Sequence, residues 1–73
     1  MNPGDLLKLK RPTILIWSKE FISIAFNRDS VSAIIYVGPT KKIWKDTTYH
    51  WVLCFFKRQE IIRCGWICVD YFE

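Results

Sequence analysis

Residues 51–67 read WVLCFFKRQEIIRCGWI, two apolar runs separated by the polar segment KRQE. Short runs rich in aromatic and β-branched side chains, bounded by polar clusters, are typical of β-strands. We therefore expect a strand at Trp51–Phe56, a turn at Lys57–Glu60 and a strand at Ile61–Ile67. The turn is short enough for the second strand to return antiparallel to the first.

The N-terminal part of the chain continues this pattern. Leucine and lysine alternate at positions 7–10 before Pro12 interrupts them, which predicts a first strand at Asp5–Arg11 that ends at a sheet edge. Apolar runs at Thr13–Trp17 and Phe21–Phe26 flank the polar residues 18–20. These two runs predict either the arms of a hairpin or one strongly bent excursion.

The middle of the chain adds one more strand and a long polar segment. A turn cluster at Asn27–Ser30 precedes the β-rich run Val31–Val37, which Gly38-Pro39 is expected to stop. The polar stretch Thr40–Thr48 then predicts a loop. Since the sequence shows no helical periodicity with caps, we expect an all-β fold with about five antiparallel strands. Closure into a small barrel would remove unpaired edges.

Length and composition limit the classes of protein. The 73 residues allow one domain, spanning 1–73, and 51% of them are apolar, which indicates a folded chain. The longest apolar run has six residues, where a transmembrane helix needs about 20. The first residues lack a signal-peptide pattern. We therefore expect the protein to be located in the cytosol, or in a particle assembled in the cytosol.

Both ends of the chain resemble SH3-like barrels. The segment Gly65–Glu73 resembles the end of an SH3-type barrel, in which a glycine leads into an apolar strand, a 3₁₀ turn and a closing strand. The segment Pro3–Leu9 and the hairpin Trp51–Leu53 with Trp66-Ile67 look like those of small SH3-like barrel proteins encoded by short phage reading frames. The resemblance implies a scaffold without catalytic chemistry, used as a small virion subunit. It therefore implies a location in the virion or the host cytoplasm.

The chain departs from SH3 domains that bind proline-rich peptides. Cys68 stands at the position of the family's 3₁₀ proline, and Leu6–Lys10 contains no aromatic residue. Tyr71 does stand where the family has a groove tyrosine. The departures argue against recognition of polyproline helices in an aromatic groove.

The three cysteines and the single histidine form a weak candidate metal or catalytic set. Three residues separate Cys64 from Cys68, and three residues also separate His50 from Cys54. Cys54 and Cys68 nevertheless sit within apolar runs, which favours reduced, buried thiols over zinc ligands. No paired carboxylates, phosphate loop or nucleophile with its base is evident. We expect no metal, no cofactor, no small-molecule substrate and no enzymatic activity.

The strongest surface signal is apolar. In Trp51–Phe56 both faces of the expected strand are apolar, and one small core cannot accommodate both sets of side chains. Either loops cover the second face or it docks on another protein. We expect a larger structural protein, or a second copy of the chain, to bind this face. The expected contact residues are Trp44, Trp51, Phe55 and Ile61, with Lys41, Lys42 and Lys45 at the rim.

A basic segment supports an alternative function. The net charge is +4, and three lysines surround a tryptophan in the expected loop at 41–45. Cations beside an aromatic plane can bind phosphates and stack bases, whereas a solvated loop with Trp44 folded over the barrel end explains the pattern equally well. The nucleic-acid-binding residues would be Lys41, Lys42, Trp44, Lys45, Lys57 and Arg58, and the patch could extend to Lys8, Lys10 and Arg11. In this case the protein would be a regulatory module that binds nucleic acid or a transcription complex through this loop.

Overall fold

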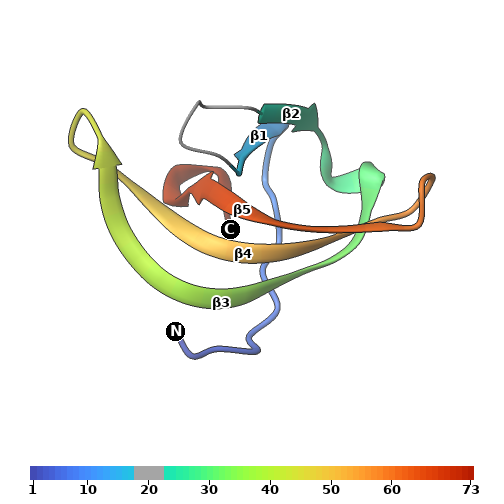
Figure 1. The fold of residues 1–73 in the computed structure, drawn as a ribbon, viewed down its shortest axis with the longest axis horizontal. Coiled ribbons are helices and arrows are strands. Elements are labelled where there is room, and N and C mark those ends of the chain that lie inside the picture. Colours follow the sequence, from blue (N-terminus) through green and yellow to red (C-terminus); the bar gives the residue numbers. More distant parts are fainter. Residues whose placement is uncertain (18–22) are drawn as a thin grey trace.

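The computed structural model describes residues 1–17 and 23–73 (Figure 1). The described residues form five antiparallel strands in one sheet, in the order β2-β1-β5-β4-β3. The strands are β1 (Thr13–Ile16), β2 (Ser23–Phe26), β3 (Val31–Trp44), β4 (Thr47–Phe56) and β5 (Ile61–Cys68). Two 3₁₀ turns, η1 (Arg28–Ser30) and η2 (Val69–Tyr71), complete the described elements. The predicted all-β class, the strand number and the 3₁₀ turn near the C-terminus are confirmed.

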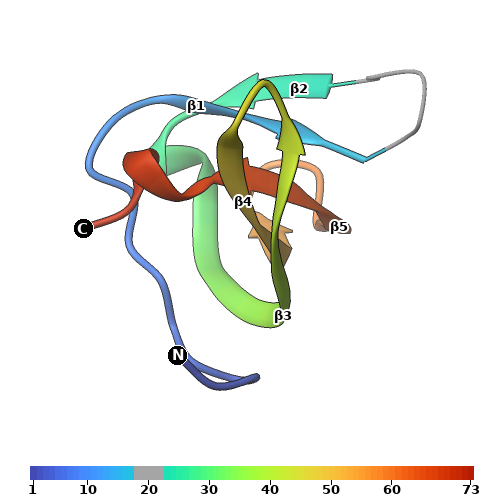
Figure 2. The ribbon, with the colours of Figure 1, turned by 90° about the vertical axis from the view of Figure 1, so that its left-hand side faces the viewer.

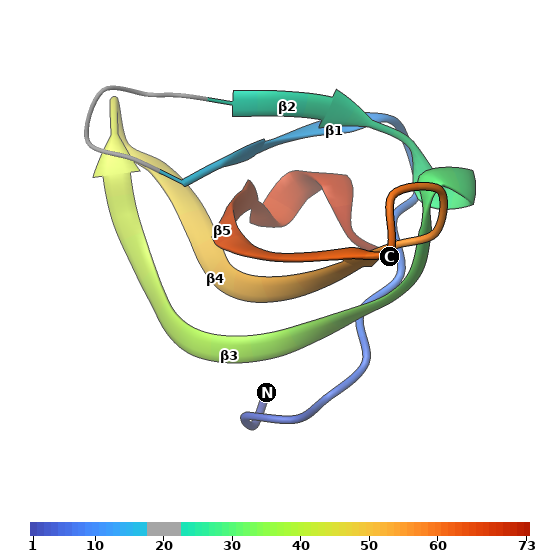
Figure 3. The same ribbon diagram turned by 45° about the vertical axis from the view of Figure 1, so that its right-hand side comes forward.

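The three long strands β3, β4 and β5 form a curled meander (Figures 1 and 3). The β4–β5 hairpin keeps one register from Phe56↔Ile61 to Tyr49↔Cys68. The predicted strands on either side of the turn at 57–60 are therefore confirmed, and β4 begins four residues earlier than expected. The short β1–β2 hairpin lies across the core from the middle of β3 (Figures 2 and 3).

The β1–β2 hairpin confirms one of the two predicted arrangements of the runs around residues 18–20. Thr13 pairs with Phe26 and Ile16 with Ser23. Ile16 also pairs with Trp66 of β5, which joins the hairpin to the meander. The expected turn residues 18–20 and the beginning of the predicted run at 21–26 lie outside the described residues.

The predicted first strand at Asp5–Arg11 is wrong as a regular strand. Its residues make only isolated bridges, Leu6 to Ile35 and Leu9 to Phe72. The segment changes partner along its length: the Leu7 amide donates to the Ile34 carbonyl, and the Lys10 amide donates to the Tyr71 carbonyl. Because it pairs with β3 and then with the C-terminal segment, it never forms a continuous ladder with either. It instead links the two sides of the curled sheet.

The predicted end of a strand at Gly38-Pro39 and the predicted loop at 40–48 are also wrong. Strand β3 continues to Trp44 through register shifts between Tyr36 and Thr40 and between Lys42 and Trp44. Gly38 has φ +83°, and the register shift between Tyr36 and Thr40 lets the chain bend there without leaving the sheet. Only Lys45 and Asp46 form the turn, and both have positive φ.

The core lies inside the curl. Its most buried large side chains are Leu15, Val52, Cys54 and Ile67. Phe26 and Phe56 close one end, with their rings edge to face and 5.0 Å between centroids. Gly65 is needed where β1 crosses β5, because a Cβ atom there would lie 2.6 Å from the Leu15 side chain. In the described part of the chain, no helix has the length and apolarity required to cross a membrane.

Candidate functional site

Strand β4 separates its apolar residues between two faces. Val52, Cys54 and Phe56 are buried in the core, while Trp51 and Phe55 are half-buried on the other face. The alternation inferred from the sequence is therefore confirmed for this strand. The second set of side chains remains outside the core.

Neighbouring strands extend this second face into an apolar surface, which we call the outer face. Residues opposite one another in a ladder share a face, so the pairings define three rows across the sheet. The rows are Ala33–Phe55–Ile62, Leu6–Ile35–Leu53–Cys64, and Trp51–Trp66–Ile16. None of these ten residues is charged. Leu6 is 71% exposed and Ile62 is 57% exposed.

The tryptophan pair lies at one end of the outer face. The rings of Trp51 and Trp66 are 4.8 Å apart between centroids and inclined at 61°. Each ring therefore restricts the other, and both are half-buried. Rigid, partly exposed aromatic side chains lose little conformational entropy on binding.

Only two of the four predicted protein-contact residues lie on the outer face. Trp51 and Phe55 lie on the outer face. Ile61 pairs with Phe56, so it belongs to the core-facing side of β5, and Trp44 lies beside the β3–β4 turn. The sequence analysis did not identify the β5 residues of the outer face. Counting residues outward from the turn at 57–60 would have given the β4–β5 pairs and therefore these residues. Leu6 gave no local signal, since only its bridge to Ile35 places it there.

A second cluster gathers aromatic and basic side chains at the β3–β4 turn. Trp44 is 51% exposed, and Lys45 Nζ lies 5.0 Å from the centroid of its ring. Trp44, Lys45 and Tyr71 line a pocket of about 350 Å³, together with Ile14, Thr47, Tyr49 and Cys68. We call this the hairpin pocket.

Two further cations border the hairpin pocket. Lys41 is the cross-strand neighbour of Tyr49. The Arg11 guanidinium lies 5.8 Å from the centroid of the Tyr71 ring. The pKa of Tyr49 is raised by burial, and further by Cys68 and Tyr71, which also line the pocket. Arg11 thus lies beside Tyr71, which lines the same pocket as Trp44 and Lys45, although Arg11 is 30 residues before Lys41 in the sequence.

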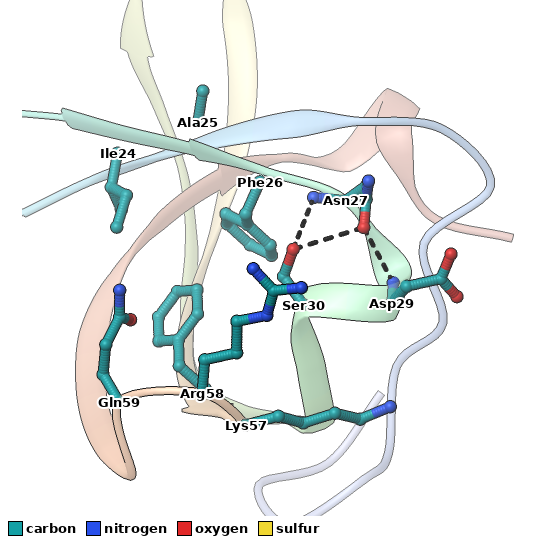
Figure 4. Close-up of a pocket in the computed structure, with 10 residues that line it drawn as sticks. Ile24, Ala25, Phe26, Asn27, Asp29, Ser30, Lys57, Arg58 and Gln59 are labelled. Atoms are coloured by element: carbon teal, nitrogen blue, oxygen red, sulfur yellow. Dashed lines mark hydrogen bonds between the residues drawn. The ribbon is translucent and has the colours of Figure 1, made fainter.

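The predicted basic patch is split between two ends of the sheet. Lys57 and Arg58 follow β4, whereas Lys41 and Lys45 lie near its start. Ten residues of strand span roughly 30 Å, and Figure 1 shows the two turns at opposite ends of the meander. Lys57 and Arg58 instead line a separate pocket of about 450 Å³ with Phe26 and Asn27 (Figure 4).

The cysteines and the histidine do not assemble into a site. Among the residues that the structure describes, no group of three or more His, Cys, Asp and Glu side chains could hold a metal ion. Burial, with a smaller contribution from Cys64, raises the pKa of the Cys54 thiol to about 12. A thiol with this pKa is protonated at neutral pH and therefore a poor nucleophile or ligand. Only Cys64 is exposed.

Comparisons of the chain with family models, with curated proteins and with solved structures found no match.

Proposed function

We propose that this protein is a non-enzymatic protein-interaction module that binds its partner through the outer face. The observation that supports this proposal is an apolar surface of three rows without a charged side chain. Soluble proteins seldom leave such a surface uncovered unless it binds something. The proposal therefore rests on this surface and not on the fold itself.

The dimensions of the outer face suit docking. Each row crosses three or four chain segments about 4.8 Å apart, and the three rows are about 6.7 Å apart, which gives a patch of roughly 20 by 20 Å. This area of roughly 400 Å² lies in the range of the largest apolar patches on monomers, which are often functional. The paired rings of Trp51 and Trp66 are the residue type that commonly anchors interfaces.

The proposed partner is a larger structural protein. The resemblance to small phage-encoded barrels suggests a virion lattice, on which the chain would act as a decoration, cement or adaptor subunit. A regular lattice offers many copies of one apolar site, so a small domain with a single docking face is sufficient. Mass spectrometry of purified particles would test this specific role, and absence of the chain from particles would contradict it.

Cys64 provides a direct test of docking. It is exposed in the middle row of the outer face, while Cys54 and Cys68 are buried. A thiol-directed photo-crosslinker should therefore attach at Cys64 and react with whatever covers the face. We expect a defined cross-link to a structural protein when the labelled chain is mixed with the particles or lysate of its source.

The control moves the label away from the outer face. Cys64→Ser combined with Gln59→Cys places the crosslinker in the exposed β4–β5 turn. The control should give no such product. A product of twice the 8.7 kDa chain mass would identify a second copy as the occupant. Equal cross-linking from positions 59 and 64, or none from either, would overturn the proposal.

A further inference from the structure

We infer that the hairpin pocket is a binding site for single-stranded nucleic acid, with Trp44 and Tyr71 as base-stacking residues and Arg11, Lys41 and Lys45 as phosphate-binding residues. The hairpin pocket adjoins the outer face, because Lys41, Tyr49 and Cys68 form the next row on the same side of the sheet. The inference uses none of the residues of the three apolar rows, and it does not depend on the proposed docking function. It rests on the positions of these side chains around one pocket.

The aromatic residues come from two separate parts of the chain. Trp44 ends β3, and Tyr71 ends η2, yet both line the same pocket. Half of the Trp44 side chain is exposed, and Tyr71 is half-buried. Tyr49 is buried and lines the same pocket. The pocket therefore has two accessible rings on which bases can stack, and such stacking does not depend on base identity.

The cations lie at the same rings. Lys45 is over Trp44 and Arg11 is over Tyr71, so each accessible ring has a positive charge beside it. Lys41 adds a third charge next to Tyr49. A strand whose bases stack on the rings would bring its phosphates to these side chains. The combination of alternating rings and cations favours a nucleic acid over an acidic peptide, which has carboxylates but no planar bases.

The structure also excludes some of the basic residues from this site. Lys42 pairs with Thr48 and therefore lies on the opposite face of the hairpin from Lys41. Lys57 and Arg58 lie at the far end of β4. These residues carry the same charge as the proposed contacts, so they provide matched controls for net charge.

Single-stranded binding requires unstacked bases. A duplex keeps its bases stacked internally and cannot present them to Trp44 and Tyr71. We therefore expect a fluorescein-labelled (dT)12 to bind at low salt, and a duplex of equal length to bind more weakly. Fluorescence anisotropy measures both affinities.

The variants separate stacking from charge. Trp44→Ala should weaken (dT)12 binding at least about fivefold, since one stacked base is worth about 1–3 kcal/mol, and Trp44→Phe should recover part of the loss. Lys41→Ala should make the slope of log K against log salt concentration shallower by about 0.7, the value for one phosphate contact on a single strand. Lys42→Ala and the pair Lys57→Ala with Arg58→Ala should leave that slope unchanged. Thermal melts establish that each variant is folded.

Several outcomes would overturn the inference. No binding of (dT)12 at low salt would do so, as would equal losses from Lys41→Ala and Lys42→Ala. Competition by poly-glutamate as effective as that by unlabelled (dT)12 would show a site for acidic polymers instead. Leu53→Thr on the outer face should leave (dT)12 binding unchanged. Failure of the (dT)12 test would therefore leave the docking proposal standing, and failure of the cross-linking test would leave the nucleic-acid inference standing.

Discussion

His50, the only histidine of the chain, shows how one residue joins distant segments. Its Nδ1 lies 2.7 Å from the Thr40 hydroxyl, which lies 2.9 Å from the Tyr36 hydroxyl. The ring packs edge to face on Tyr36 and at a tilt against Phe72. His50 therefore connects the two halves of β3 on either side of its bend and brings them against the C-terminal segment.

The environment of His50 predicts a measurable titration. Burial lowers its pKa below 6.5, and the positive N-terminal amine lowers it further. A single imidazole resonance in a proton NMR titration should therefore report a pKa below 6.5, and acetylation of the N-terminus should raise it. The stability that this residue contributes should be complete above pH 6.5 and decline as the pH falls through the lower folded-state pKa. A measured pKa of 6.5 or higher would contradict this.

At the scale of elements, strand β3 is where structure and sequence expectations differ most. Glycine and proline usually interrupt a strand, and lysine-rich segments usually lie in loops. In β3 the register shifts absorb Gly38 and Pro39 as a bend, and the ladder with β4 resumes at Thr40. The bend lets a 14-residue strand follow the curl of the sheet. The lysines thereby become strand residues with defined faces.

The β3–β4 turn predicts a stabilising substitution. Asp46 has φ +60°, a conformation that costs side-chain-bearing residues free energy and that glycine adopts freely. Asp46→Gly should therefore raise the free energy of unfolding by roughly 0.5–1 kcal/mol and the melting temperature by a few degrees. Asp46→Ala removes the same charge but keeps a Cβ atom, so it should lower the melting temperature. Equal shifts in melting temperature for both variants would contradict this prediction, because they would show that the lost charge, and not the backbone conformation, sets the change in stability.

At the scale of the whole molecule, apolar and acidic residues are segregated. None of the seven acidic residues lies in β3, β4 or β5. The apolar residues fill a core inside the curl and also cover the outer face. A domain this small has a limited interior, so its apolar composition of 51% exceeds what the core can hold. The surplus forms a surface, which is why we propose docking as the function.

Two adjacent residues test this partition between core and surface. Val52 is fully buried and Leu53 belongs to the outer face. Val52→Thr places a hydroxyl in the core and should lower the free energy of unfolding by about 1–3 kcal/mol. Leu53→Thr keeps a residue suited to strands and should cost less than about 1 kcal/mol while reducing surface hydrophobicity. Urea unfolding measures both, and a larger loss for Leu53→Thr would contradict the assigned faces.

The sequence by itself determined features that depend on near neighbours. The β4–β5 strands, the turns at 27–30 and 57–60 and the two faces of Trp51–Phe56 follow from local alternation and from polar clusters, and the structure confirms them. These features are readable because side chains in a strand alternate with a period of two. Two of the predicted contact residues, Trp51 and Phe55, were placed on one face for this reason.

Only the tertiary structure decided features that depend on distant partners. The N-terminal segment is not a regular strand because β3 and the C-terminal segment compete for its backbone groups. Leu6 joins the outer face through one bridge, and Arg11 reaches Tyr71 because the Lys10 amide binds the Tyr71 carbonyl. The length of β4 separates Lys57 from Lys41. Such positions follow from long-range pairing, which no local pattern encodes.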